Sequence, residues 1–353
     1  MTKPVRILVV GLGHMGQSHA KAYHALEGFE IVGLMSRTAQ RYGDRLAPEL
    51  RAYPLFEDFA AALRATRPDA VSINSWPDTH AALALQAMDA GCHVFVEKPL
   101  ATTVADAEAV VAKATALGRK LVLGYILRVH PAWTRLVEIG RTLGKPLVMR
   151  MNLNQQSSGP AWTWHKNLMA SLTPIVDCGV HYVDVMCQLT QARPVRVHGI
   201  GARLAAETAV QNYGHLHVTF ADGSVGWYEA GWGPMMSEVA WFVKDVWGPK
   251  GSISIVARAE GGSADIDQHT RTNALRLHHA AIDAENRFTR PDEWLDMSDE
   301  PDHQALCARE QAFFLRAILE DLDLTASMAD AVTSLRIVLA AQQSIEEGRA
   351  IEL

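Results

Sequence analysis

The feature that most constrains the fold is a regular alternation of strand-like and helix-like segments over residues 5–124. The short apolar runs VRILVV, FEIVGLM, DAVSIN, HVFV and KLVLGY are separated by alanine-rich stretches, expected to form helices at 15–26 and from residues 39, 79 and 104. Such alternation requires crossover connections, which make the strands parallel and place helices on both faces of one sheet. We therefore predict an α/β, doubly wound parallel sheet of the Rossmann type in an N-terminal domain, residues 1–124.

The second half of the chain does not continue the strand–helix alternation. One helix at 132–141 is followed by longer strands without helices between them, in the runs PLVMRMNLN, PVRVHGIGARL, GHLHVTF, SVGWYEA, EVAWFVKDV and GSISIV. The sequence Ala221-Asp222-Gly223 is typical of a hairpin turn, and helices are expected at 304–321 and 328–347, with loops over 257–302. Because single cores rarely exceed roughly 250 to 300 residues, we predict a second, α+β domain at 125–353 with a large, mostly antiparallel open sheet.

Composition narrows the range of partners and compartments. The 39 acidic and 33 basic side chains are interspersed and give a formal charge of −6, which does not favour nucleic acid or a membrane as a partner. No run of about 20 apolar residues could span a bilayer, and the four residues before the first strand are too few for a signal peptide. The four cysteines form no CxxC pair, so reduced thiols and a cytoplasmic protein are expected, with no metal site.

A glycine-rich turn joins the first strand to the first helix. It reads Gly11-Leu12-Gly13-His14-Met15-Gly16, with the spacing of a dinucleotide fingerprint in the required context. The glycines allow a tight turn and close approach of a pyrophosphate, to which the start of the helix offers free N–H groups. The turn therefore predicts nucleotide binding by Gly11, Gly13, His14, Met15 and Gly16, and the alternative is a glycine turn without a ligand.

The end of the second strand bears on the choice of nucleotide. Folds that bind NAD usually place an acidic residue there, on the ribose 2′-hydroxyl, whereas this strand ends in Met35-Ser36-Arg37. A hydroxyl from Ser36 and guanidinium groups from Arg37 and Arg41 suit a 2′-phosphate. NADP is therefore favoured over NAD. The alternative is that both arginines are solvated surface residues and that NAD binds without the acid.

The run HVFVEKPL delivers two opposite charges to the end of an apolar strand. In open α/β sheets ligands bind beyond the carboxyl ends of the strands, so Glu97 and Lys98 are expected at the nucleotide edge. The alternative is a surface ion pair that caps the strand and contributes little stability.

A second group of ionisable residues lies in the run DCGVHYVD. Residues four apart share one helix face, so a helix beginning near Asp177 would point Asp177 and His181 in the same direction, with Asp184 on that face. Imidazole titrates closest to neutral pH, which suits His181 for proton transfer, with Asp177 orienting it or binding substrate. The alternative makes Asp177 an N-cap and His181 a core histidine.

These segments together resemble the Gfo/Idh/MocA oxidoreductases, which include glucose-fructose oxidoreductase and inositol dehydrogenases. The resemblance covers nearly the whole chain, through GLGHMGQSHAKAY, NSWPDTH, AGCHVFVEKPLATTVADAEAV, GYILRVHPAW, DCGVHYVD, GPKGSISI and the last 27 residues, SMADAVTSLRIVLAAQQSIEEGRAIEL. It implies a catalytic set of Lys98, Asp177 and His181, and an often cis Lys98–Pro99 bond.

The resemblance also implies further binding residues. Near the cofactor they are Asn74, Trp76, Pro77, His80, Glu97 and Lys98, and near the substrate they include Lys98, Tyr125, Arg128, Asp177 and His181. Two departures weaken a direct transfer of substrate: residues 170–176 lack the glycine-rich turn of many relatives, and Ile126-Leu127 precede Arg128 where relatives often carry a polar residue.

Amide and indole side chains follow the first strand of the second domain. Asn152, Trp162, Trp164 and His165 combine hydrogen-bonding groups with flat apolar faces, a combination that suits a polyhydroxylated ring such as a sugar or cyclitol. The alternative is that these tryptophans fill core or interface space.

The resulting hypothesis is an NAD(P)-dependent oxidoreductase that transfers a hydride between nicotinamide C4 and a secondary alcohol or ketone. His181 would take the hydroxyl proton and Lys98 would stabilise the developing alkoxide. Three alternatives remain: a glycosidase that uses NAD transiently, a nucleotide sensor without catalysis, and a reductase of a non-sugar ring. Because the large sheet should expose one face, a homodimer or homotetramer is expected.

Overall fold

A computed structural model describes residues 3–39, 42–237, 243–256, 272 and 274–353. The chain divides into two compact units, Met1–Ile126 with His303–Val332, and Leu127–Asp302 with Thr333–Leu353. Each unit has its own sheet.

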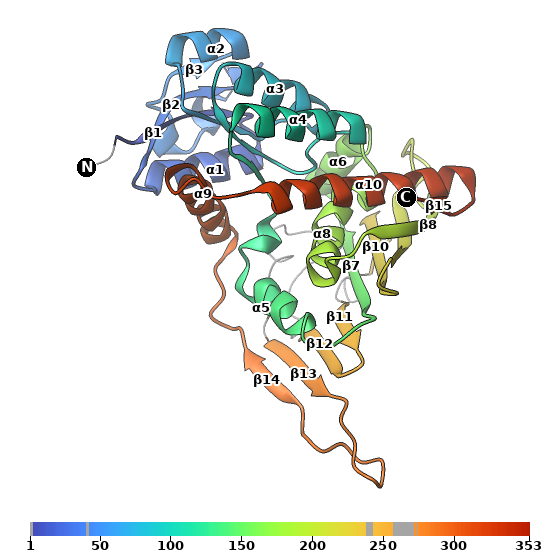
Figure 1. Cartoon of the computed structure of the whole chain (residues 1–353). Coiled ribbons are helices and arrows are strands. Elements are labelled where there is room, and N and C mark those ends of the chain that lie inside the picture. The colour runs from blue at the N-terminus through green and yellow to red at the C-terminus, as the bar shows by residue number, and fades with distance from the viewer. Residues whose placement is uncertain (1–2, 40–41, 238–242, 257–271, 273) are drawn as a thin grey trace. The chain divides into compact units, whose positions relative to one another are not determined.

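The first unit is built on a six-stranded parallel sheet (Figure 1). Its order is β3-β2-β1-β4-β5-β6, and every pair of neighbours is parallel. The strands are β1 (Val5–Val10), β2 (Phe29–Met35), β3 (Leu55–Phe56), β4 (Ala70–Ile73), β5 (His93–Val96) and β6 (Leu121–Leu123). The order reverses between β1 and β4, so the predicted doubly wound sheet is confirmed.

The helices of this unit end where local chemistry stops them. They are α1 (His14–Ala25), α2 (Phe59–Thr66), α3 (His80–Asp89) and α4 (Val104–Leu117), with short 3₁₀ helices η2 (Gly43–Arg45), η3 (Pro48–Leu50), η4 (Pro77–Thr79) and η5 (Ile126–Arg128), the last crossing the division at residue 126. In α4 the Thr103 hydroxyl accepts the Asp106 N–H, and Gly118 closes the helix with φ +60°. The helix predicted from residue 39 is wrong, because Gly43 and Pro48 interrupt the segment and leave only 3₁₀ turns.

One helix from late in the sequence belongs to this unit. Helix α9 (His303–Leu319) packs against α1 (Figure 1), and its Phe314 ring lies 6.2 Å from Phe29 and 6.1 Å from Phe95 between ring centroids. The division predicted after residue 124 placed this helix in the second domain. Its apolar side chains place it on the parallel sheet instead, because that is where they are buried.

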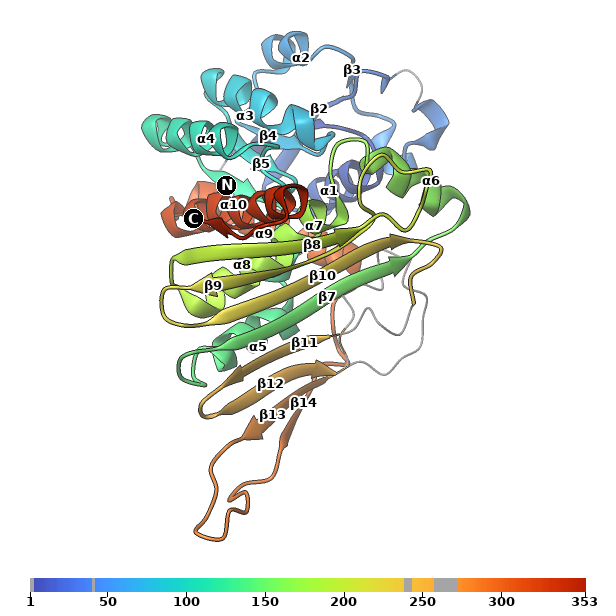
Figure 2. The ribbon, with the colours of Figure 1, turned by 90° about the vertical axis from the view of Figure 1, so that its right-hand side faces the viewer.

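The second unit contains a nine-stranded mixed sheet (Figure 2). Its order is β14-β13-β12-β11-β7-β10-β9-β8-β15, and only β7 and β10 pair in parallel. The strands are β7 (Val148–Gln156), β8 (Pro194–Ala202), β9 (Tyr213–Phe220), β10 (Val225–Gly233), β11 (Lys244–Gly248), β12 (Gly251–Val256), β13 (Ala274–His279), β14 (Glu293–Asp296) and β15 (Ile351–Glu352). The predicted open, mostly antiparallel sheet is confirmed.

The turn between β9 and β10 is the predicted hairpin. Gly223 adopts φ +83° and its N–H donates to the Phe220 carbonyl at 3.0 Å.

The loop predicted over 257–302 needs a correction, since β13 and β14 form an antiparallel pair there. Their sequence is polar because they lie at the edge of the sheet, where less apolar surface is covered. Residues 257–271 and 273, and the first part of the predicted strand at 238–242, lie outside the described residues.

Helices cover one face of this sheet. They are α5 (Pro131–Gly140), α6 (Gly159–Leu168), α7 (Pro174–Asp177), α8 (Gly179–Thr190) and the part of α10 (Thr325–Glu347) that follows residue 332. Helices α5 and α8 lie behind the sheet in Figure 2. Met149 and Met151 of β7 are buried on this side, and a Cβ added to Gly226 of β10 would come within 2.5 Å of the Met186 sulfur. Met186 of α8 therefore packs directly against Gly226, and a larger residue there would displace its side chain.

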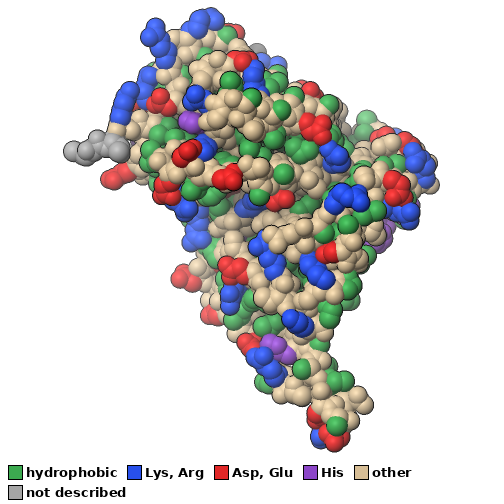
Figure 3. Space-filling view, in the orientation of Figure 1, with side chains coloured by type: hydrophobic (Ala, Val, Ile, Leu, Met, Phe, Trp, Pro, Cys, Tyr) green, Lys and Arg blue, Asp and Glu red, His purple; other side chains and the backbone are tan. Residues whose placement is uncertain are grey.

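Charges of both signs are interspersed on the molecular face seen in Figure 3. Among the described helices, none combines the length and the apolar character that crossing a bilayer requires.

Candidate cofactor and catalytic site

The glycine-rich turn follows β1 and opens α1. Gly11 has φ +85°, and a Cβ added there would lie 2.4 Å from the Asn74 carbonyl oxygen. A Cβ added to Gly16 would lie 1.9 Å from the Gly11 carbonyl oxygen, whereas one added to Gly13 would meet no atom within 4 Å. Gly11 and Gly16 therefore allow backbone packing. Gly13 leaves open space at the start of α1, where N–H groups of the first turn can receive a phosphate, so the residues fit a dinucleotide.

The carboxyl end of β4 lies against this turn. The Asn74 amide donates to the Val10 carbonyl at 3.3 Å and to the Ser72 hydroxyl at 3.1 Å. Trp76 is 43% exposed at the edge, while Pro77 beside it is buried. Asn74 thus fixes the β1 and β4 ends that would flank the nucleotide, and Trp76 offers a ring toward solvent.

His80 joins two loops at the same edge. Its Nδ1 lies 2.8 Å from the Pro99 carbonyl and its Nε2 lies 3.0 Å from the Ser75 carbonyl. Burial lowers the pKa of His80, although both carbonyl contacts oppose the shift. Both ring nitrogens of His80 thus face backbone oxygens of the loops after β4 and β5, and its contact with the cofactor stays a prediction.

The tip of β2 carries no acidic side chain. Ser36 accepts the Thr38 N–H at 3.4 Å, and Arg37 is exposed. Arg41, the second guanidinium in the NADP prediction, lies outside the described residues.

Glu97 and Lys98 follow β5, the strand next to β4, and so lie at the same carboxyl edge of the parallel sheet as Asn74. The Lys98–Pro99 peptide bond is cis, as the resemblance implied. The Glu97 side chain points inward and is 7% exposed; its Oε1 lies 2.7 Å from Nε2 of His19, and its Oε2 accepts the Lys98 backbone N–H at 3.1 Å. Since Glu97 is buried against His19, this is not the surface ion pair of the alternative interpretation.

Several residues around Glu97 were not predicted, because no sequence motif marks them. His19, Tyr23, Glu310 and Gln311 are buried beside it, two from α1 and two from α9. Three potential metal ligands, His19, Cys307 and Glu310, have ligand atoms within 4.8 Å of one another. A metal ion there would displace a hydrogen bond, because Nε2 of His19 already faces Glu97 and Nδ1 faces Gln311.

In the second unit, the predicted helix at Asp177 is divided in two. Asp177 is the last residue of α7, and His181 lies in the first turn of α8. The residues preceding the two helices are Thr173 and Cys178, so Asp177 is not an N-cap. Pro174 opens α7, and the His181 N–H donates to the Cys178 carbonyl at the start of α8. Asp177 is buried and His181 half-buried.

Arg128 and Asp184 form a paired group in this unit. The Arg128 guanidinium donates to Asp184 through Nε at 2.9 Å and Nη2 at 2.6 Å, and Gln188 donates to the same carboxylate at 2.9 Å. This bidentate ion pair holds the Arg128 side chain, from η5, against Asp184 of α8. Of the other predicted substrate residues, Tyr125 is buried in the first unit.

The predicted amide and aromatic group is only partly exposed. Asn152 is buried, its Oδ1 accepts the Val243 N–H at 2.6 Å, and its carbonyl accepts from buried Lys244, whose pKa burial lowers to about 7. Trp162 is buried and donates to Glu207 at 3.3 Å. These contacts bind Asn152 and Trp162 to neighbouring segments of the unit.

His165 and Trp164 differ sharply in exposure. His165 is buried and stacks on Trp232 at 4.6 Å with an interplanar angle of 6°, and its Nδ1 lies 2.9 Å from the Ser157 hydroxyl. Trp164 is 48% exposed and is the aromatic ring of this group that is open to a ligand.

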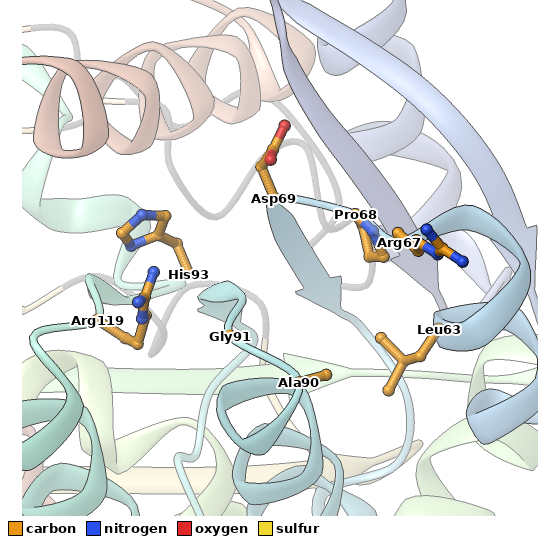
Figure 4. A pocket seen from close by; sticks show the side chains of 8 residues that line it. All are labelled: Leu63, Arg67, Pro68, Asp69, Ala90, Gly91, His93 and Arg119. Atoms are coloured by element: carbon orange, nitrogen blue, oxygen red, sulfur yellow. The ribbon is translucent and has the colours of Figure 1, made fainter.

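A separate pocket of about 420 Å³ lies at the opposite edge of the parallel sheet (Figure 4). Asp69 and His93, at the amino ends of β4 and β5, line it together with Arg67 and Arg119. Burial, with the charges of Arg119 and Lys120, lowers the pKa of His93 to about 4. None of the predicted site residues lines this pocket, so it is separate from the nucleotide edge.

Comparison with known proteins identifies both parts of the chain. Residues 5–125 match the family model described as "Oxidoreductase family, NAD-binding Rossmann fold", and residues 135–254 match the GFO/IDH/MocA C-terminal domain. The UDP-N-acetylglucosamine 3-dehydrogenase of Acidithiobacillus ferrooxidans is 32% identical over 223 residues, 63% of this chain and 65% of that protein.

Two further relatives extend the match. The scyllo-inositol 2-dehydrogenase (NAD(+)) of Bacillus subtilis is 28% identical over 305 residues, 80% of this chain and 86% of that protein. A solved structure of the Acidithiobacillus ferrooxidans enzyme superposes with a TM-score of 0.76 and 26% identity, covering 98% of this chain and 99% of that one. Because both domain models match in order, the chain belongs to the Gfo/Idh/MocA family of oxidoreductases.

Proposed function

We propose that the protein is an NAD(P)-dependent dehydrogenase or reductase acting on a secondary alcohol, or the matching ketone, of a sugar, sugar derivative or cyclitol. The observation that carries the proposal is the Glu97-Lys98 turn at the carboxyl end of β5, beside the glycine turn and Asn74. Ligands of doubly wound sheets bind at this edge, so an ammonium group here suits a reacting oxygen next to a nicotinamide ring.

Names of relatives support the substrate class. The relatives reported above are dehydrogenases of a nucleotide sugar and of an inositol, which share ring carbons bearing hydroxyl groups. Exposed Trp164 offers a flat face that suits such a ring.

Three residues of this chain would each have a separate role in the hydride transfer. When bound, the nicotinamide accepts or donates the hydride at C4. Lys98 stabilises negative charge on the substrate oxygen, the His181 imidazole takes the hydroxyl proton as the C–H hydride departs, and Asp177 orients the imidazole or the substrate. Lys98 lies in the first unit and Asp177 and His181 in the second, so their convergence on one substrate is part of the proposal.

NADP is proposed as the preferred nucleotide. Ser36 and Arg37 follow β2 where an acidic residue would otherwise hold a ribose 2′-hydroxyl, and Arg41 adds a further guanidinium in the sequence. NAD is the alternative, and the affinities for the two nucleotides decide between them.

A fluorescence titration with NADPH and NADH tests nucleotide binding, followed by a panel of sugars, inositols and keto-sugars read as nicotinamide absorbance. We expect tighter binding of NADPH and turnover on at least one member of the panel. Release of a sugar without net change in absorbance would indicate a glycosidase instead. Failure to bind either nucleotide would reject the proposal.

Substitution tests the residue roles once a substrate is found. We expect Lys98→Met and His181→Ala each to lower kcat by about a hundredfold or more while nucleotide affinity changes little. Wild-type turnover in either folded variant would show that the residue is not catalytic.

A further inference from the structure

Glu97 is held by a chain of buried side chains that come from α1 and α9. These two helices pack against each other (Figure 1). Its Oε1 lies 2.7 Å from Nε2 of His19, and Nδ1 of His19 lies 2.8 Å from the Gln311 amide nitrogen. The Gln311 carbonyl oxygen accepts the Tyr23 hydroxyl at 2.5 Å. All four side chains are nine-tenths or more buried, so no solvent competes for these contacts.

The direction of each hydrogen bond follows from its atoms. An amide nitrogen can only donate, so Nδ1 of His19 accepts from Gln311. The ring proton of a neutral His19 is then on Nε2, which donates to the Glu97 carboxylate. The Tyr23 hydroxyl donates to the Gln311 carbonyl oxygen. With these atoms the donors point in one direction, from Tyr23 through Gln311 and His19 to Glu97.

A second carboxyl lies beside Glu97. Glu310 is 3% exposed, and neither of its oxygens has a hydrogen-bond partner among the residues that the structure describes. Burial, together with the charge of Glu97, raises the pKa of Glu310 well above its ordinary value. A neutral Glu310 adds no second negative charge next to Glu97. His80 also interacts electrostatically with Glu97, and Cys307 with Tyr23.

The backbone side of Glu97 is equally confined. A Cβ added to Gly124 would lie 3.0 Å from the Glu97 carboxyl carbon, so a larger residue at position 124 would make the carboxylate shift. The other carboxylate oxygen, Oε2, accepts the Lys98 N–H at 3.1 Å. An orientation imposed on Glu97 by His19 is thereby passed to the backbone of Lys98.

We propose that His19, supported by Gln311 of α9, is a positioning residue for Lys98 that acts through Glu97. His19 holds the carboxylate so that Oε2 fixes the Lys98 backbone and directs the ammonium group to the nicotinamide edge. The inference rests on the proposed dehydrogenase function. It adds to that function a requirement for a helix supplied by residues 303–319.

A double-mutant cycle tests this coupling. The variants are His19→Leu, Glu97→Gln and the double variant, with His19→Gln as a rescue because its amide can still donate toward position 97. The matched control is His24→Leu, which makes the same change at an exposed position of α1. Measurements are kcat, nucleotide affinity by fluorescence and the unfolding temperature.

If His19 positions Lys98 through Glu97, the variants should change kcat but not nucleotide affinity. We expect His19→Leu to lower kcat about ten- to hundredfold with nucleotide affinity within about threefold of wild type. His19→Gln should restore most of kcat, and His19→Leu should cost under about twofold once Glu97 is already glutamine. His24→Leu should match wild type.

Other outcomes overturn the inference. If the two single effects on kcat multiply in the double variant, His19 does not act through Glu97. A kcat that is unchanged in folded His19→Leu removes the role directly. Should His19→Leu fail to fold, Gln311→Leu provides the test, and wild-type kcat in that variant overturns the support from α9. A wild-type chain that turns over no panel member fails the proposed function itself, which is a distinguishable result.

Discussion

At the scale of single residues, two glycines in the same turn serve different physical requirements. A Cβ at Gly16 would lie 1.9 Å from the Gly11 carbonyl oxygen, whereas a Cβ at Gly13 would enter open space. We expect Gly16→Ala to lower the unfolding temperature by several degrees, because the turn must move. Gly13→Ala should leave the unfolding temperature of the nucleotide-free protein unchanged and weaken nucleotide binding at least about tenfold, because it fills space meant for the pyrophosphate. Thermal unfolding and fluorescence titration of both variants check this, and equal effects on stability would contradict it.

At the scale of elements, helix α9 docks on the parallel sheet through Phe314. The Phe314 ring is fully buried between Phe29 and Phe95, while the ring of the preceding residue, Phe313, is only half-buried. We expect Phe314→Ala to cost about 3 to 5 kcal/mol of unfolding free energy, and Phe313→Ala distinctly less. Loss of α9 packing should also lower kcat in Phe314→Ala, since Gln311 would no longer be held beside His19. Denaturant unfolding measures the first effect. A Phe313→Ala cost as large as that of Phe314→Ala would argue against the assigned packing.

At the scale of the whole molecule, one face of the nine-stranded sheet bears on assembly, because none of the described helices covers it. Ile200, Val225 and Trp247 lie on the face opposite α8 and are 48%, 39% and 42% exposed. We propose that the protein forms a homodimer or homotetramer that covers this face, because burying exposed apolar surface against a second copy is favourable. Light scattering should then give two or four chains, and Trp247→Glu should shift the mass toward one. Leu117→Glu, at an exposed position on α4, is the control and should leave the mass unchanged. A monomeric wild type would contradict the proposal.

Local chemistry explains the parts of the fold that the sequence predicted well. The strand–helix alternation of residues 5–124, the glycine turn after β1 and the hairpin at Gly223 each depend on neighbouring residues, so period and turn type could be read directly. The helix expected from residue 39 failed for a local reason as well. Its alanines and charges suggested a helix, but Gly43 and Pro48 have the stronger effect on the backbone.

By itself, the sequence determined that one part of the chain is α/β and another α+β, and it determined the nucleotide turn and the Glu97-Lys98 and Asp177–His181 segments, because each follows from a pattern of neighbouring residues. Only tertiary structure decided what Glu97 contacts. His19 and Gln311 are 292 residues apart and carry no shared motif, yet folding brings their side chains to 2.8 Å in one buried cluster. The physical reason is that α9 gains its stability by burying Phe314 against the parallel sheet, and this packing places the residues before Phe314 in α9 beside α1. Burial of a helix face is a property of the whole fold, so the partners it brings together cannot be read from local spacing.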